Sequence, residues 1–310
     1  MLGLFAVAAV GAGVAWMARR RDGEPADLPP PGGDPLADAS APSAEDEAAG
    51  RWVDGPGGRL WVRTAGDGGP ALLLLHALGG TGAHWAPQLA ALAANCRVAA
   101  PDLRGHGRSA AAADAGYTIA DYAADALAVA DALGFDRFAI AGHSLGAAVA
   151  VEVGAAYPQR TLALALVDPG ADASGEPAAA VEEGIASVGA DPRAEFTYHY
   201  REFLHGARRD TARRVLADLA ATADAVLLES YGAMMRYPLR QRLAVYGGAR
   251  VCLAGPLNDV AGSLPTLLPD LPTEWLAPTS HWLQLDRPEE TSYLLGELAR
   301  RVLGGTAGAR

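Results

Sequence analysis

Short apolar runs alternate with longer segments of helical period along most of this sequence, and this alternation constrains the fold more than any other feature. From Arg51 onward, Gly or Pro bounds each apolar run, and the helical segments lie between the runs. Strands that are connected through helices pair in parallel, because the helix returns the chain to the end of the sheet from which it came. The pattern therefore predicts an α/β domain over residues 51–310, with a mostly parallel central sheet flanked by helices.

The expected strands are the apolar runs bounded by turn-forming residues, namely Arg59–Arg63, Ala71–His76, Arg97–Ala100, Arg137–Ala141, Leu162–Asp168, Arg250–Ala254 and Glu274–Ala277. We expect the first two of these strands to form a hairpin. Helices are expected where apolar residues recur at helical spacing, chiefly in Thr118–Leu133, Leu145–Tyr157 and Pro288–Val302. Residues from about 172 to 245 have helical period and no clear strand, which predicts a helical cap inserted over the strand ends.

The N-terminus begins with an uninterrupted apolar run, residues 2–18, which three arginines follow directly. As a helix it would be about 25 Å long, enough to cross the hydrocarbon core with little to spare. A secretory signal peptide carries its positive charge before the apolar run, whereas here the charge follows it. We therefore expect residues 1–18 to be a transmembrane anchor that holds the catalytic domain in the cytoplasm. An uncleaved signal peptide and a misplaced start codon are the alternatives.

Residues 19–50 are rich in proline, alanine and acidic side chains and have few large apolar residues. Such a stretch cannot bury enough surface to offset the entropy of ordering it, so it is predicted to be a disordered linker. The net charge of −11 argues against a nucleic-acid partner, which requires a basic face. Cys96 and Cys252 lie in apolar stretches and are expected to be small buried side chains. No spacing resembles a metal site, so we expect no metal and no cofactor.

An apolar strand, a G-x-S-x-G sequence and a helix follow one another directly in RFAIAGHSLG, residues 137–146. A sharp turn from strand to helix lifts a serine hydroxyl above the sheet and leaves the next backbone N–H free. A bare G-x-S-x-G occurs by chance in a glycine-rich chain, so the signal comes from its position between strand and helix. Ser144 is therefore the predicted nucleophile.

Three further motifs accompany this turn: LLLLHALGG at 72–80, PDLRGHGRS at 101–109 and TSHWLQLDRPEE at 279–290. In this order of motifs, the chain from Arg51 to about Val302 resembles the α/β-hydrolase family. The resemblance implies that the backbone N–H groups of Leu78 and Leu145 form an oxyanion hole. The family usually has His-Gly where this chain has His76-Ala77. We expect His76 to be a structural hydrogen-bonding residue.

Among the histidines, His281 is the predicted general base, because it lies in a loop after a late strand and before the last helix. His106 and His143 belong to family motifs and are expected to have packing roles. His84, His199 and His205 are expected at the surface or along a pocket.

The acid that orients His281 has two candidates. In the family it usually lies three residues after a glycine that ends the strand before the histidine loop. Here that place in Gly255-Pro-Leu-Asn258-Asp259 holds asparagine, and the aspartate follows one residue later. Some members of the family place the acid at the end of an earlier strand, where this chain has Asp168. We take Asp259 as the predicted acid and Asp168 as the alternative.

The predicted reaction is acyl transfer to water, with Ser144 attacking an ester, lactone or thioester carbonyl to form an acyl-enzyme. A small acyl substrate, which can be lipophilic, would then be the partner, alongside the membrane. A non-catalytic binding protein and an acyltransferase on the same fold are the alternatives. Aromatic and methionine side chains of the insertion either line the substrate pocket or form the core beneath the cap: Phe196, Tyr198, Tyr200, Phe203, Tyr231, Met234, Met235 and Tyr237.

Overall fold

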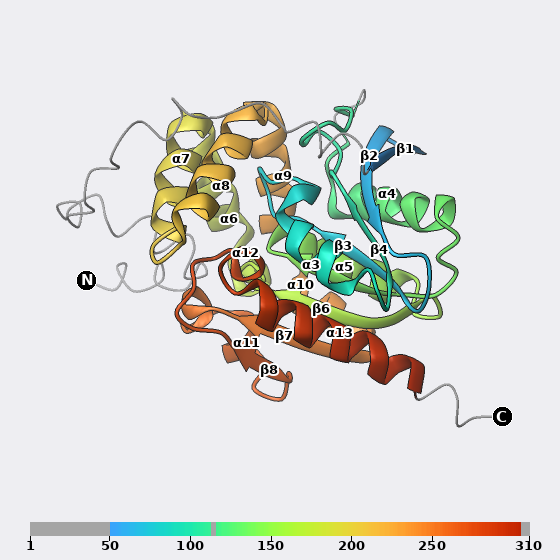
Figure 1. Cartoon of the computed structure of the whole chain (residues 1–310). Coiled ribbons are helices and arrows are strands. Elements are labelled where there is room, and N and C mark those ends of the chain that lie inside the picture. The colour runs from blue at the N-terminus through green and yellow to red at the C-terminus, as the bar shows by residue number, and fades with distance from the viewer. Residues whose placement is uncertain (1–49, 113–115, 305–310) are drawn as a thin grey trace.

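Strand β3 (Ala71–Leu75) is apolar at every position, and each of its side chains is buried. Alternate side chains of a strand point to opposite faces of the sheet, so a strand without polar positions requires cover on both faces. Leu73 and Leu75 belong to one core cluster, and Leu72 and Leu74 belong to the other. The sheet is therefore the middle layer of three, with helices above and below it (Figure 1).

The computed structural model describes residues 50–112 and 116–304. Its sheet has eight strands in the order β1-β2-β4-β3-β5-β6-β7-β8. The pairs β1–β2 and β2–β4 are antiparallel, and every other pair is parallel. The remaining strands are β1 (Gly50–Gly55), β2 (Gly58–Ala65), β4 (Arg97–Pro101), β5 (Phe138–His143), β6 (Thr161–Val167), β7 (Ala249–Ala254) and β8 (Thr273–Trp275).

The prediction that the first two expected strands form a hairpin is wrong, because β2 and β3 are not paired with each other. β2 instead forms a hairpin with β1, a strand that was not expected from the sequence, and its other neighbour is β4. The loop after β2 contains Gly66 and Gly69, both with positive φ. A Cβ on either glycine would meet the backbone before β4, at Ala93 or Asn95. The loop therefore crosses the start of β4 and delivers β3 to the far side of that strand.

Two groups of helices cover the faces of the sheet. α3 (Ala86–Leu92) and α13 (Pro288–Gly304) pack together on one face, while α4 (Ile119–Ala132), α5 (Leu145–Ala156) and α10 (Leu239–Val245) pack on the other. A capping box begins α4: the Thr118 side chain accepts the N–H of Asp121, and the Asp121 carboxylate accepts the N–H of Thr118.

The predicted helical insertion is present. Its helices are α6 (Ala178–Gly189), α7 (Pro192–Phe203), α8 (Arg209–Ala221) and α9 (Asp224–Arg236). These four helices form a cap beside the sheet (Figure 1). Residues 239–245, which the prediction assigned to the same insertion, form α10 and pack against α5 instead. The cap therefore ends near Arg236, and α10 belongs to the layer below.

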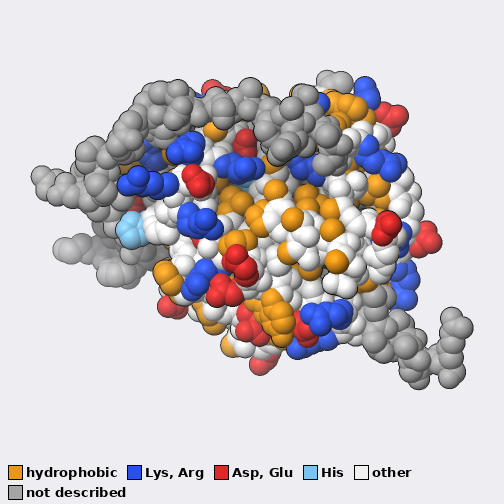
Figure 2. Space-filling model, viewed as in Figure 1, with side chains coloured by type: hydrophobic (Ala, Val, Ile, Leu, Met, Phe, Trp, Pro, Cys, Tyr) orange, Lys and Arg blue, Asp and Glu red, His pale blue; other side chains and the backbone are white. Residues whose placement is uncertain are grey.

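The anchor predicted over residues 1–18 and most of the linker predicted over 19–50 lie outside the described residues. Within residues 50–112 and 116–304, no helix has the length and apolar character needed to cross a bilayer. Cys96 and Cys252 are both buried as free thiols, as predicted. Figure 2 shows arginine and acidic side chains interspersed on one face of the molecule, with apolar side chains scattered between them.

Candidate active site

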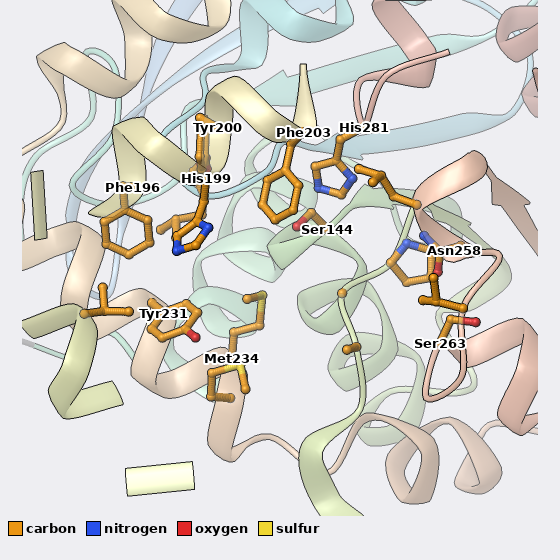
Figure 3. Close-up of a pocket in the computed structure, with 18 of the residues that line it drawn as sticks. Ser144, Phe196, His199, Tyr200, Phe203, Tyr231, Met234, Asn258, Ser263 and His281 are labelled. Carbon is orange, nitrogen blue, oxygen red and sulfur yellow. The ribbon is translucent and has the colours of Figure 1, made fainter. Parts of the chain in front are cut away.

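Ser144 occupies a strained turn between β5 and α5. Its backbone has φ 52° and ψ −110°, which a residue other than glycine rarely adopts. A Cβ on Gly142 would overlap the carbonyl oxygen of Gly146, and a Cβ on Gly146 would overlap that of Leu75. Both glycines of the motif are therefore required by close backbone contacts. The turn predicted from G-x-S-x-G is confirmed, and Ser144 faces a pocket under the cap (Figure 3).

Asp168 follows β6, the strand next to β5, and is the second non-glycine residue with positive φ in the described ranges, at 40°. Its side chain is fully buried, and its Oδ2 lies 2.6 Å from Nδ1 of His281. The Nδ1–H of the imidazole can donate to this carboxylate, which leaves Nε2 as the basic ring nitrogen. The serine turn and the carboxylate thus follow the neighbouring strands β5 and β6, and the loop after β8 brings the imidazole to the carboxylate.

The preference for Asp259 as the partner of His281 is wrong, and the alternative, Asp168, makes that contact. After β7 the chain forms a short 3-10 turn, η5 (Pro256–Asn258), and Asp259 lies beyond it with an exposed side chain. The preceding residue, Asn258, is buried and donates from Nδ2 to Oδ1 of Asp168 at 2.8 Å. The turn therefore directs the asparagine inward and the aspartate outward.

The loop that carries His281 is fixed from several sides. The backbone N–H of His281 donates to the carbonyl of Phe203 at the end of cap helix α7, at 3.0 Å. The N–H and hydroxyl of Ser280 both donate to Asp286, at 2.9 and 2.5 Å. The imidazole also lies 4.6 Å, between ring centroids, from His143, the residue before Ser144. The imidazole is thus held in place by contacts from the cap, from its own loop and from the turn that carries Ser144.

The two residues of the expected oxyanion hole lie in segments that touch each other. Leu145 is the first residue of α5, so its N–H has no acceptor within the helix. Leu78 lies in the loop after β3 and lines the same pocket as Ser144. The end of β3 contacts the start of α5 closely enough that Gly146 has no room for a side chain. The arrangement of the two segments is compatible with two N–H groups beside Ser144.

The other histidines have structural surroundings. His76 is buried, with Nδ1 2.7 Å from the carbonyl of Ala77 and Nε2 accepting the N–H of Leu103 at 2.8 Å, so the predicted structural role is confirmed. His106 and His143 are buried as well, as their packing roles require.

The predicted places of the remaining three histidines are wrong for one residue and correct for the other two. His84 is buried and pairs with Asp218 of α8 at 2.9 Å, so its predicted place at the surface or in a pocket is wrong. His199 lines the pocket under the cap, and His205 is exposed.

The pocket between the cap and the strand ends has a volume of about 210 Å³. Most of the aromatic and methionine side chains predicted to line it do so: Phe196, Tyr200, Phe203, Tyr231, Met234 and Met235. Tyr198 and Tyr237 do not, because Tyr198 is exposed and the Tyr237 hydroxyl donates to Glu152. Figure 3 shows Phe196, His199 and Tyr231 on the opposite side of the pocket from Asn258. The lining is thus mostly apolar.

Two residues that matter to the site were not assigned a role from the sequence. The sequence marks Asn258 only as an asparagine at the place where the family has an acid, and that departure is the signal it offers. Tyr200 donates a hydrogen bond to the Leu78 carbonyl, whereas the sequence identifies it only as an aromatic residue of the insertion. Within the described ranges, no group of three or more His, Cys, Asp or Glu side chains is arranged to hold a metal ion.

A mostly parallel sheet with helices on both faces, a serine on a strand-to-helix turn and a helical cap over the strand ends define an α/β protein of the hydrolase type. The sequence model of the α/β hydrolase fold matches residues 70–240, more than half of the chain. The chain belongs to the α/β-hydrolase family.

Several known proteins are similar to this chain. A putative carbamate hydrolase, RutD, of Variovorax paradoxus is 48% identical over 101 residues, 32% of this chain and 38% of that protein. A dihydrolipoyllysine-residue acetyltransferase component of an acetoin cleaving system from Pseudomonas putida is 42% identical over 113 residues, 36% of this chain and 30% of that protein. The chain thus matches only about a third of the length of these curated relatives.

The similarity to solved structures extends further along the chain. The crystal structure of a hydrolase from Pseudomonas aeruginosa PA01 superposes with a TM-score of 0.68 at 27% identity. That match covers 81% of this chain and 98% of the other.

Proposed function

We propose that this protein is a serine hydrolase that cleaves an ester-type bond, whether carboxylic ester, lactone or thioester, through an acyl-enzyme. The observation that carries the proposal is the 2.6 Å contact between Asp168 and His281, because His281 lines the same pocket as Ser144. A nucleophile on a strained turn, an imidazole and a buried carboxylate are the parts from which an activated serine is built.

In the proposed reaction His281 removes the hydroxyl proton of Ser144 through Nε2 as the serine oxygen attacks the substrate carbonyl. The N–H groups of Leu78 and Leu145 stabilise the negative charge that forms on the carbonyl oxygen. His281 then gives the proton to the leaving oxygen or sulfur, and the acyl group stays on Ser144. A water molecule, deprotonated by the same imidazole, cleaves the acyl-enzyme and regenerates the hydroxyl. Asp168 holds the imidazole in the tautomer with Nδ1–H and stabilises its charged form.

The pocket favours a substrate with a neutral and largely apolar acyl group. The described residues that line the pocket include no Asp, Glu, Lys or Arg. A carboxylate on the acyl chain would lose its hydration there without gaining a cationic partner. A neutral hexanoate ester is therefore expected to be cleaved much faster than a monoester of adipic acid. The carbamate hydrolase relative suggests including a carbamate in the same substrate panel.

A fluorophosphonate probe, which reacts with activated serines, tests the proposal on the full chain. We expect the wild-type protein to be labelled and Ser144→Ala to remain unlabelled at the same folded concentration. The control is Ser187→Ala, which removes a hydroxyl that is exposed in cap helix α6. Failure of folded wild type to react would reject the hydrolase and favour the alternative of a non-catalytic binding protein.

An acyltransferase is the second candidate, because an acyl-enzyme can be attacked by an alcohol in place of water. The similarity to part of an acetyltransferase component favours keeping it in the test. Hydrolysis of a chromogenic ester in the presence of increasing 1-butanol separates the two. A hydrolase releases free acid throughout, whereas an acyltransferase forms mainly the butyl ester.

We also propose that residues 2–18 anchor the protein to a membrane, with the catalytic domain on the cytoplasmic side. The support is the apolar run followed by three arginines. Membranes from cells that produce the full chain are washed with alkaline carbonate to test this. An anchored chain stays with the pellet, whereas release into the wash would reject the anchor.

A further inference from the structure

Asn258 stands beside the acid of the proposed triad and contacts it directly. Its side chain is 4% exposed, and its Nδ2 donates to Oδ1 of Asp168 at 2.8 Å. The backbone N–H of Gly255 donates to the same oxygen at 2.7 Å. The other oxygen, Oδ2, is the one that lies 2.6 Å from His281. Each oxygen of the carboxylate thus has its own set of partners.

We propose that Asn258 is a positioning residue, which holds the Asp168 carboxylate so that one oxygen stays directed at His281. This inference rests on the proposed function, since it assigns Asn258 a task within that triad. A carboxylate can rotate about the bond to its Cβ, and its χ2 angle has only broad minima. Two donors on Oδ1 fix this rotation and satisfy the lone pairs that burial removes from water.

The backbone of Asp168 itself does not orient its carboxylate. Asp168 follows β6 with a φ of 40°, and its N–H is engaged by the carbonyl of Leu253 on β7. Its carboxylate is therefore held by groups from another segment, the turn that follows β7. Gly255 supplies one donor from its backbone, and Asn258 supplies the donor that depends on the side chain. Only the second donor is open to a substitution.

The titratable groups around the pair decide what a change of charge at position 258 would do. His281 faces the pair from the loop before α12 (Leu283–Asp286), and the ring of His143 lies 4.6 Å from its ring between centroids. Cys252 of β7 is close as well, and burial together with the Asp168 charge raises the pKa of its thiol, so it stays neutral. Asp168 is thus the acidic partner that a new carboxylate at position 258 would meet.

Asn258→Asp separates positioning from packing because it keeps the size of the side chain. In its protonated form the introduced carboxyl group carries an O–H that can donate to Asp168 as the amide does. In its ionised form the introduced group can only accept, and it repels the carboxylate of Asp168. Two adjacent carboxylates lose their last proton at a raised pH and titrate as a pair. The variant should therefore work while the pair retains a proton and fail once the pair loses it.

The experiment measures the rate of fluorophosphonate labelling of the full chain between pH 5 and pH 9. The rate of Asn258→Asp is divided by the wild-type rate at each pH, which cancels the titration that both proteins share. We expect this ratio to fall by about tenfold or more as the pH rises, because a hydrogen bond to a charged group is lost. Asn258→Leu, which offers no donor at any pH, should be slower by a similar factor at every pH.

Asn95→Asp is the matched control, because it introduces the same charge at an exposed asparagine outside the pocket. Its ratio should stay near one. A ratio for Asn258→Asp that does not change with pH would overturn the proposal, whether the rate is normal or uniformly low. So would an Asn258→Leu variant whose ester hydrolysis shows only a raised KM, since Asn258 would then bind substrate. In all these cases labelled wild type would leave the serine-hydrolase proposal standing.

Discussion

The hydroxyl of Tyr200, in cap helix α7, donates a hydrogen bond of 2.5 Å to the carbonyl oxygen of Leu78. Burial raises the pKa of Tyr200, so the phenol stays protonated and remains a donor. The N–H of Leu78 is one of the two proposed oxyanion-hole donors. The C=O of the same residue is hydrogen-bonded to the cap. The cap therefore encloses the pocket and is also hydrogen-bonded to the loop on which the proposed chemistry depends.

Tyr200→Phe is expected to lower kcat for ester hydrolysis by about tenfold, because a small misplacement of a catalytic group is costly. The matched control is Tyr246→Phe, in which the lost hydroxyl also donates to a buried backbone carbonyl, that of Thr161. Both variants should lose about 1 kcal/mol of unfolding free energy. Only Tyr200→Phe should lose activity. Equal activity of the two variants would show that the cap does not orient the loop.

Asp168→Asn is expected to slow fluorophosphonate labelling by about a thousandfold or more, because an amide cannot stabilise the charged imidazole. Asp259→Asn should label at the wild-type rate, since its side chain is exposed and has no contact with His281 in the described structure. Circular dichroism confirms that each variant is folded. A slow Asp259→Asn beside a normal Asp168→Asn would refute the assignment of the acid.

Acid is expected to destabilise the fold from about pH 6.5 downward. Burial lowers the pKa of His106 to about 4 and holds the pKa values of His76 and His143 well below their ordinary range. The unfolded chain binds protons at these histidines near pH 6.5 while the folded chain does not, so stability is full above that pH and falls below it. Each histidine contributes about 1 kcal/mol per pH unit until its folded form titrates.

Urea unfolding at pH 7 and pH 5 measures this slope. His106→Asn keeps a donor for the carbonyl of Arg104, which His106 contacts through Nδ1, but it does not titrate. Its stability should fall by about 1 kcal/mol less per pH unit than that of wild type. The same slope in both proteins would mean that His106 is not held neutral in the fold.

Arg104 and Asp125 form a buried ion pair, with Nε donating to Oδ2 at 2.6 Å and Nη2 donating to Oδ1 at 2.8 Å. Arg104→Met leaves the carboxylate buried without its charged partner, so we expect a loss of about 3 to 5 kcal/mol in unfolding free energy. Arg236→Met is the control, because Arg236 pairs with Glu182 in a similar forked geometry but at an exposed site. Its stability should change much less. Similar losses in both variants would contradict this account.

Much of the fold could be predicted because its signals are local. The run Leu72–Leu75, the capping box at Thr118 and the glycines around Ser144 each depend on neighbours within a few residues. The pairing of β2 could not be predicted in the same way. It depends on the loop after β2 crossing the segment before β4, which lies about thirty residues further along the chain.

The amino-acid sequence was enough to predict the α/β class, the turn that carries Ser144 and the position of His281 in a late loop. Strand, turn and helix patterns involve adjacent residues, so they can be recognised without the folded chain. The choice of the carboxylate that meets the imidazole required the folded chain. Asp168 and Asp259 follow neighbouring strands, β6 and β7, and both could reach the same edge of the sheet. The direction of a side chain after a tight turn follows from backbone angles and packing, and here these place Asn258 inside and Asp259 outside.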